Sequence, residues 1–132
     1  MKSFVFASFI FVFACTLASF QQNDLLKASM NRGKEIFAAN CATCHMQNGE
    51  GIDGVYPPLA KSDYLMADKT RAIKQVLEGA IGTMIVNDVK YNGFMTGFNL
   101  NDQEVSDVLN YIMNSWGNTG EMVTPAEVKA VR

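Results

Sequence analysis

Two cysteines and a histidine follow one another closely, in the order Cys41, Cys44 and His45. Cysteines three positions apart lie on one side of a helical turn, and a histidine directly after the second points its ring beneath the plane that they tether. At this spacing both thiols can add to the two vinyl groups of one haem while the imidazole binds its iron. The sequence therefore predicts one covalently bound haem c, attached at Cys41 and Cys44, with His45 as an iron ligand.

Two other uses of a Cys-x-x-Cys spacing agree less well with the rest of the chain. A redox dithiol of the thioredoxin kind is expected in a βαβ context, and a structural zinc site needs four ligands. Cys41, Cys44 and His45 supply three, and the one remaining cysteine, Cys15, lies in a segment that we expect to be removed or lipidated. Haem attachment is the interpretation that we favour.

Residues 1–20 have the pattern of a secretory signal peptide. Lys2 gives a positive start, and residues 4–14 form an apolar run that is short for a membrane span. We expect cleavage after Ala18, which would discard Cys15, and export of a soluble protein to the periplasm. The alternative is cleavage before Cys15, because residues 12–15 resemble a lipoprotein signal, and it would leave a lipid anchor on the membrane.

The length and charge of the chain limit what it can be. Its 132 residues carry a formal net charge of −2 and suffice for one domain, which we place at residues 21–132. Loss of Lys2 with the signal would leave 10 basic residues against 13 acidic ones. Nothing in this composition indicates nucleic-acid binding, and the charge is too small to identify the charge of a partner protein.

A helix is expected between Asp24 and Asn40, where apolar residues recur at helical spacing. Gly33 lies inside this range, although a glycine there costs up to about 1 kcal/mol relative to alanine. Gly33 and Phe37 are four positions apart and share one face of the helix. This pair indicates a place where another helix crosses closely.

The crossing partner is expected near the C-terminus. Asn101 is a capping residue, and Glu104 three positions later completes a capping box. The helix that follows is expected to end at Gly117-Asn118. Its apolar stripe, extended by Tyr111 and Trp116, consists of Val105, Val108, Leu109, Ile112 and Met113.

Shorter elements are expected between these two helices and after them. Three glycines make residues 48–54 a loop, and Asp68 is expected to cap a helix that runs to Glu78. Residues 83–86 and 89–91 flank a two-residue turn and predict a β-hairpin. A last short helix is expected to begin at residues 124–127.

The stiff segment from Tyr56 to Leu59 follows the glycine-rich loop. Its two prolines fix φ and have carbonyl groups but no amide donors. One of these carbonyls could accept the Nδ1 hydrogen of His45, as is common for metal-bound imidazoles, and Leu59 would then pack on the haem. An ordinary stiff turn agrees equally well with these residues.

The second axial ligand of the iron cannot be a histidine of this chain, because His45 is the one histidine. The remaining candidates are a methionine thioether, a lysine or no protein ligand at all. Met95 lies between Gly93 and Gly97, and flanking glycines would let a loop curl its side chain over a flat cofactor. We predict Met95 as the ligand, with Met84 as second choice. Histidine and methionine ligation raises the reduction potential and suits electron transfer.

Together these residues resemble the class I cytochromes c. The elements that match are Gly33 and Phe37, the Cys41–His45 motif, Pro57-Pro58-Leu59, Met95, and the final helix with Leu109, Tyr111 and Ile112. They span residues 30–117, which leaves 118–132 as a C-terminal extension. The resemblance implies an all-α cytochrome c fold, in which the N- and C-terminal helices cross over one covalently bound haem and a small hairpin precedes the methionine. It also implies that Pro57 supplies the carbonyl for His45.

Several segments resemble one group within that family more closely. Residues 56–65, the hairpin and Tyr91-Asn92-Gly93 are similar to haem domains that serve as electron-entry modules of bacterial respiratory enzymes, including those fused to copper nitrite reductases. Such domains usually have proline directly after the ligand methionine, whereas Thr96 follows Met95 here.

Two functional hypotheses follow. The first is a one-electron carrier without a substrate of its own, which is not an enzyme and which serves a larger redox partner of a respiratory chain. The second is a haem enzyme or gas sensor in which Met95 is displaced from the iron. A distal acid-base residue would help the second kind of chemistry, yet no second histidine exists. We favour the carrier.

Overall fold

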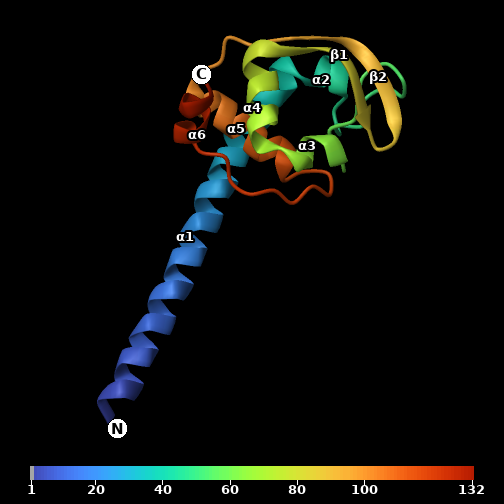
Figure 1. Ribbon diagram of the computed structural model, residues 1–132. Coiled ribbons are helices and arrows are strands. Elements are labelled where there is room, and N and C mark those ends of the chain that lie inside the picture. Colours follow the sequence, from blue (N-terminus) through green and yellow to red (C-terminus); the bar gives the residue numbers. More distant parts are fainter. Residues whose placement is uncertain (1) are drawn as a thin grey trace.

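The computed structural model describes the backbone of residues 2–132 and the side chains of residues 21–132. Its elements are α1 (Lys2–Asn40), α2 (Ala42–His45), α3 (Asp63–Ala67), α4 (Lys69–Glu78), β1 (Gly79–Val86), β2 (Val89–Thr96), α5 (Asp102–Met113) and α6 (Pro125–Val131). Helices predominate, and β1 and β2 form one small antiparallel sheet at the edge of the domain (Figure 1). The expected mostly helical fold with a small hairpin is confirmed.

The helix expected from Asp24 to Asn40 is the C-terminal part of α1, which begins upstream at Lys2. The predicted signal segment, residues 1–20, lies outside the residues whose side chains are described. Its cleavage and the fate of Cys15 therefore stay predictions. Within the described part of the chain, no helix is both long and apolar enough to cross a membrane.

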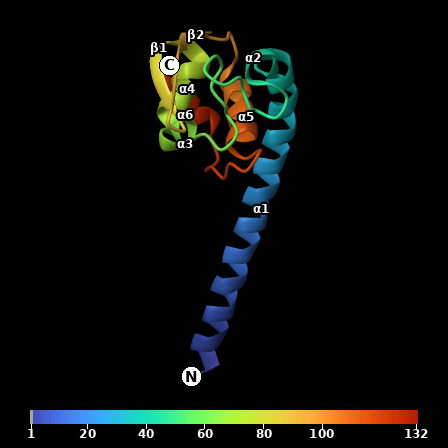
Figure 2. The ribbon, with the colours of Figure 1, turned by 90° about the vertical axis from the view of Figure 1, so that its right-hand side faces the viewer.

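The crossing of α1 and α5 is the central packing contact, and Figure 2 shows the two helices side by side. A Cβ atom at Gly33 would overlap the backbone carbonyl of Asp107, so only glycine lets the helices approach this closely. One turn further along α1, Phe37 is buried against Tyr111 and Trp116, with ring centroids 5.5 and 5.0 Å away. The predicted role of Gly33 is confirmed.

Replacing Gly33 by alanine should therefore destabilise the holoprotein by about 2 kcal/mol, because forcing apart a packed helix crossing costs more than the gain in helix propensity. The free energy of unfolding from urea titration measures this. Asn31→Ala, an exposed substitution on the same helix, is the control and should change stability by less than about 0.5 kcal/mol. Equal stability of the Gly33→Ala variant and the parent would contradict the close crossing.

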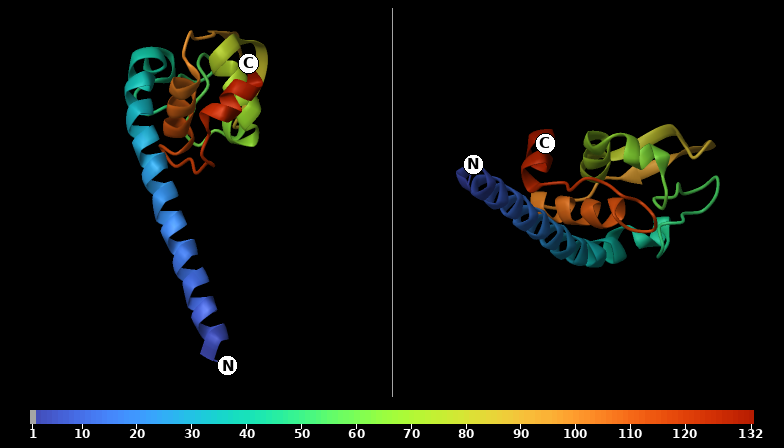
Figure 3. Two further views of the ribbon diagram at one scale, coloured as in Figure 1. Left: turned by 90° about the vertical axis from the view of Figure 1, so that its left-hand side faces the viewer. Right: turned by 90° about the horizontal axis from the view of Figure 1, so that it is seen from below.

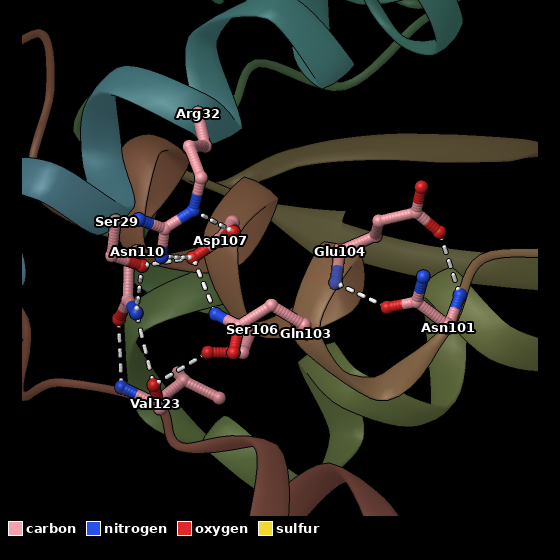
Figure 4. Close-up of polar contacts among 9 residues, drawn as sticks. All are labelled: Ser29, Arg32, Asn101, Gln103, Glu104, Ser106, Asp107, Asn110 and Val123. Carbon is pink, nitrogen blue, oxygen red and sulfur yellow. Dashed lines mark hydrogen bonds and ion pairs between the residues drawn. The ribbon is translucent and has the colours of Figure 1, made fainter.

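A buried carboxylate also ties α1 to α5 (Figure 4). Asp107 is 2% exposed and accepts hydrogen bonds from Arg32 Nε and Nη2, both at 2.7 Å. Ser29 Oγ and Gln103 Nε2 donate to the same carboxylate, at 2.5 and 2.9 Å. Four donors therefore satisfy the two oxygens, which offsets the cost of burying the charge. No sequence pattern indicated this pair of residues 75 positions apart.

Asp107→Asn should destabilise the protein by about 2 kcal/mol. The amide has the size of the carboxylate but only one acceptor oxygen, and its NH2 group would face the hydrogen-bond donors that now bind the second oxygen. The cost is moderated because the Arg32 side chain is 54% exposed and water can solvate it. Asp102→Asn is a matched control: its ion pair with Arg132 is partly exposed and should contribute less than about 1 kcal/mol. Equal losses in the two variants, measured by urea unfolding, would contradict a special role for the buried pair.

The C-terminal extension is held against α5 by side chains that bond its backbone. Asn110 Nδ2 donates to Val123 O at 2.9 Å, and Val123 N donates back to Asn110 Oδ1 at 2.7 Å. Ser106 Oγ donates to the same carbonyl at 2.9 Å. The chain then enters α6 through a capping box formed by Thr124 and Glu127, which confirms the expected last helix.

The capping residues expected from the sequence are confirmed at α4 and α5. The Asp68 side chain accepts from Arg71 N, and Asn101 and Glu104 form a capping box. The expected end of the C-terminal helix is wrong, because α5 ends at Met113 rather than at Gly117-Asn118. Trp116 has φ 53° and turns back to contact Tyr111, which interrupts the helix before Gly117.

The expected hairpin is confirmed, with Asn87 and Asp88 at positive φ in its turn. It is longer than the sequence indicated, because pairing continues to Gly79 and Thr96. Met95 consequently lies in β2 opposite Ala80, and the expectation that it lies in a loop is wrong. Glycines within the strands have low β propensity, which hid this extension from the sequence pattern.

Candidate functional site

The motif Cys41–His45 lies where α1 passes into α2. Cys41 N donates to Phe37 O, and His45 N donates to Cys41 O, both at 2.9 Å, so helical bonding continues through the junction. Met46 follows with φ 63° and ends α2 directly after His45. The packing of Phe37 in the core thereby sets the position of the two cysteines and the histidine.

Both cysteines of the motif are free and partly buried. Burial raises the pKa of the Cys41 thiol to about 11, and the neighbouring Cys44 adds to the rise. A thiol with such a pKa is protonated at neutral pH, and an unpaired thiol is the form that adds to a vinyl group. The raised pKa at Cys41 is unlike the lowered pKa that activates the nucleophilic thiol of a redox dithiol.

His45 is 9% exposed, and its Nδ1 lies 2.9 Å from the carbonyl oxygen of Pro57. A carbonyl can only accept, so Nδ1 carries the proton and Nε2 keeps its lone pair for a metal. Burial lowers the pKa of the imidazole, which favours the neutral form that binds iron. The hydrogen bond that the family resemblance implied between Pro57 and His45 is present.

The loop between His45 and Pro57 closes tightly on Gly51. Gly51 N donates to His45 O at 3.0 Å, and its φ is 65°. A Cβ atom at this position would overlap the carbonyl of Tyr56 and come within 2.8 Å of Pro57 O. Gly51 therefore lets the Pro57 carbonyl reach the imidazole, a role that the sequence analysis did not identify.

Leu59 follows this loop and packs partly buried against the hydrophobic core. Its backbone N donates to Gly49 O at 2.7 Å, and its carbonyl accepts from Asn118 Nδ2 at 2.8 Å. These bonds hold the proline segment in place from both sides. The predicted contact of Leu59 with haem stays a prediction.

The inner face of the hairpin carries the two methionines that the sequence analysis favoured. Strand alternation puts Met84, Tyr91 and Met95 on one face, where Tyr91 is buried and the two methionines are partly buried. Between them, Gly82 pairs with Gly93, and a Cβ atom on either glycine would meet nothing within 4 Å. This face therefore has open space between the methionines, as a flat cofactor requires.

The hairpin and α2 lie on different sides of the domain, as Figures 2 and 3 show. His45 and the two methionines thus come from separate elements on separate sides. Among the described side chains, no group of three or more His, Cys, Asp and Glu residues could hold a metal ion. Cys41, Cys44 and His45 therefore do not converge on one ion position, which disfavours the zinc alternative.

Comparison with known proteins identifies the family. The family model for cytochrome c matches residues 30–116. Cytochrome c-552 of Thermus thermophilus is 38% identical over 127 residues, which cover 89% of this chain and 85% of that protein. Cytochrome c6 of Cyanidium caldarium is 30% identical over 116 residues, 83% of this chain and 94% of that protein.

A third relative is part of a larger protein. The cytochrome c subunit of alcohol dehydrogenase (quinone) from Gluconobacter oxydans is 33% identical over 107 residues, which cover 77% of this chain and 22% of that subunit. The matched family binds haem c covalently and transfers electrons rather than catalysing a reaction on a substrate. The matched region contains Cys41, Cys44 and the oriented His45, and the chain belongs to the cytochrome c family, as a monohaem class I c-type cytochrome.

Proposed function

We propose that this cytochrome is a periplasmic one-electron carrier that serves a larger respiratory enzyme. In this proposal Cys41 and Cys44 hold haem c by thioether bonds, and His45 and Met95 are the axial ligands of its iron. Haem supplies the one-electron couple, and a methionine ligand favours the ferrous state and so raises the reduction potential. Residues 1–20 act as the signal peptide, and residues 21–132 form the exported domain.

The observation that best supports this proposal is the hydrogen bond between His45 Nδ1 and Pro57 O. It fixes the tautomer and the orientation of the imidazole before any ligand arrives, so Nε2 is available without rearrangement. Gly51 and the bonds at Leu59 keep the carbonyl in place. A rigid ligand set lowers the reorganisation that accompanies each gain or loss of an electron.

The position of Met95 supports its part in the proposal. It lies on the inner face of the hairpin beside the open space at Gly82 and Gly93. Met84 lies on the same face and is the alternative ligand. Met113, by contrast, is 3% exposed within the hydrophobic core, and Met66 packs against that core. These two methionines contribute to packing.

The class of partner rests on the relatives. One of them is the cytochrome c subunit of alcohol dehydrogenase (quinone), a relative that belongs to a larger redox enzyme. We infer a comparable partner for this chain, either a dehydrogenase that reduces it or an oxidase that oxidises it. The predicted signal peptide, residues 1–20, supports a periplasmic location for this exchange.

Optical spectroscopy of the purified, haem-loaded protein tests the proposal. A weak far-red absorption band from sulfur-to-iron charge transfer in the ferric protein, and no spectral response of the ferrous protein to carbon monoxide, are expected. A high-spin spectrum that shifts with carbon monoxide would mean an open iron position. That result would refute the carrier and favour an enzyme or gas sensor.

Mass spectrometry of protein expressed in a bacterium that processes lipoproteins tests the location. A mature chain that begins after Ala18 is expected. A diacylglycerol group on Cys15 would show instead that the protein is anchored to the membrane surface.

A further inference from the structure

The outer face of the hairpin carries three large apolar side chains that the described part of the chain leaves uncovered. We use the name outer hairpin face for the side chains of Ile81, Thr83, Ile85, Lys90, Asn92 and Phe94. Ile81 is 84% exposed, Phe94 is 73% exposed and Ile85 is 61% exposed. Ile81 and Phe94 occupy directly paired positions, so their side chains lie side by side.

This exposure is costly for a small domain, because single exposed apolar residues are common but adjacent large ones on one sheet face are not. An uncovered apolar hairpin also invites unwanted pairing with other chains. The inner face of the same strands carries Met84, Tyr91 and Met95, whose side chains are buried or half-buried. Apolar side chains thus lie on both faces, but those of the inner face are covered by the domain and those of the outer face are not, which indicates that the outer face meets another molecule.

The charge on this face limits what that molecule can be. Lys90 is the one charged residue among the six, and Thr83 and Asn92 are neutral. Strong charge steering would need a dense patch of one sign. A partner that fits this face therefore presents a contact surface that is itself apolar and nearly uncharged.

The size of the face limits how long the contact lasts. Two isoleucines and a phenylalanine offer on the order of 400 Å² of apolar surface. A stable protein complex buries about 800 Å² on each partner, whereas redox encounters lie at the lower end of the range. The outer hairpin face is therefore large enough for a brief encounter and too small for a permanent assembly.

The face also lies close to the proposed iron ligand. Phe94 directly precedes Met95 in β2, and their side chains point to opposite faces of the strand. A partner docked on the outer hairpin face would be separated from Met95 by a single strand layer. The exchange of one electron at this face needs no change in covalent bonds or protons.

We infer that the outer hairpin face is the docking surface for a redox protein whose own contact surface is apolar and nearly uncharged, bound transiently beside its redox centre. This inference rests on the carrier function proposed above. A second copy of the chain meets the description of such a partner, because identical outer hairpin faces are apolar and carry little like charge to repel each other. The second copy is therefore the probe of choice.

Electron exchange between ferrous and ferric holoprotein measures this docking. One electron leaves a ferrous haem and reduces a ferric haem, so the mixture is unchanged in composition, and NMR line broadening gives the second-order rate. Phe94→Ser and Ile81→Ser should each slow the exchange on the order of tenfold, as expected for central contact residues. Ile81 lies on the other strand and its side chain points to the opposite face from Met95, so its variant separates docking from a direct effect on the iron ligand.

Leu25→Ser is the matched control, because Leu25 is 56% exposed but lies on α1 away from the hairpin. It should leave the rate within twofold of the parent. The rate should also change little between low and high salt, since few charges take part. A steep salt dependence, or hairpin variants that exchange as fast as the parent, would overturn the inference.

A second measurement does not depend on electron transfer. Amide chemical shifts of the ferrous holoprotein should change with protein concentration at residues 79–96, and Phe94→Ser should abolish this change. Shifts confined to the loop around Val55, another exposed apolar residue, would assign docking to that loop and overturn the inference. A parent protein that docks at residues 79–96 but exchanges no electrons would refute the carrier function and leave the docking surface standing.

Discussion

Replacing Met95 by alanine should lower the reduction potential on the order of 0.1 V, within the ~0.8 V range that axial ligands of haem span. The physical reason is the loss of a thioether that stabilises ferrous iron. The same substitution should let carbon monoxide bind the ferrous protein. Protein-film voltammetry and the carbon monoxide difference spectrum measure the two effects.

Met84→Ala is the matched control, because Met84 lies on the same inner face of the hairpin and has similar exposure. It should leave both the potential and the response to carbon monoxide almost unchanged. If the two variants exchange roles, Met84 is the ligand. If neither variant binds carbon monoxide, the ligand is not one of these methionines.

Replacing both Cys41 and Cys44 by serine should remove all covalently bound haem from the chain. Serine has nearly the size of cysteine but cannot form a thioether, so haem would be held by ligation and packing alone and would leave when the protein unfolds. Haem staining after denaturing electrophoresis measures this directly. Each single variant should keep one thioether and some staining.

The Met95→Ala variant is the control for this experiment, since loss of an axial ligand leaves the thioethers intact. It should retain its haem after denaturation. Haem that stays on the double cysteine variant under denaturing conditions would rule out attachment at these two positions.

The two experiments address different links between the chain and its cofactor. The cysteines determine whether haem stays on the unfolded chain. The methionine determines the reduction potential and whether carbon monoxide can reach the iron. His45 takes part in both, because its position follows from the cysteine motif while its tautomer follows from the hydrogen bond with Pro57. A variant that loses its haem on denaturation but keeps the reduction potential is therefore changed at an attachment residue. A variant that keeps its haem but has a lower reduction potential is changed at an iron ligand.

Local features could be predicted from the sequence because each depends on a few neighbouring residues. The motif Cys41–His45 lies within one helical turn, and the capping boxes at Asn101 and Thr124 involve partners three positions apart. The hairpin turn at Asn87-Asp88 was predictable for the same reason. These short-range rules hold whatever the rest of the chain does.

Features that join distant parts of the chain depend on the tertiary structure. The pair of Arg32 and Asp107, the full length of the hairpin and the resulting strand position of Met95 followed from contacts that no local pattern encodes. The end of α5 at Met113 was missed because Trp116 turns back to pack on Phe37.

The sequence by itself therefore determined the chemistry, namely two thiols and one imidazole at the spacing that attaches haem, because covalent spacing within a helical turn is local. It also indicated Gly33 as the place where two helices cross, because glycine inside a helix costs stability unless close packing requires it. Only the tertiary structure decided how the Pro57 carbonyl, which the family resemblance implied, reaches His45 and which hairpin face carries the methionines. Both depend on side chains that meet across the fold, where packing and strand register choose among partners that the sequence leaves equal.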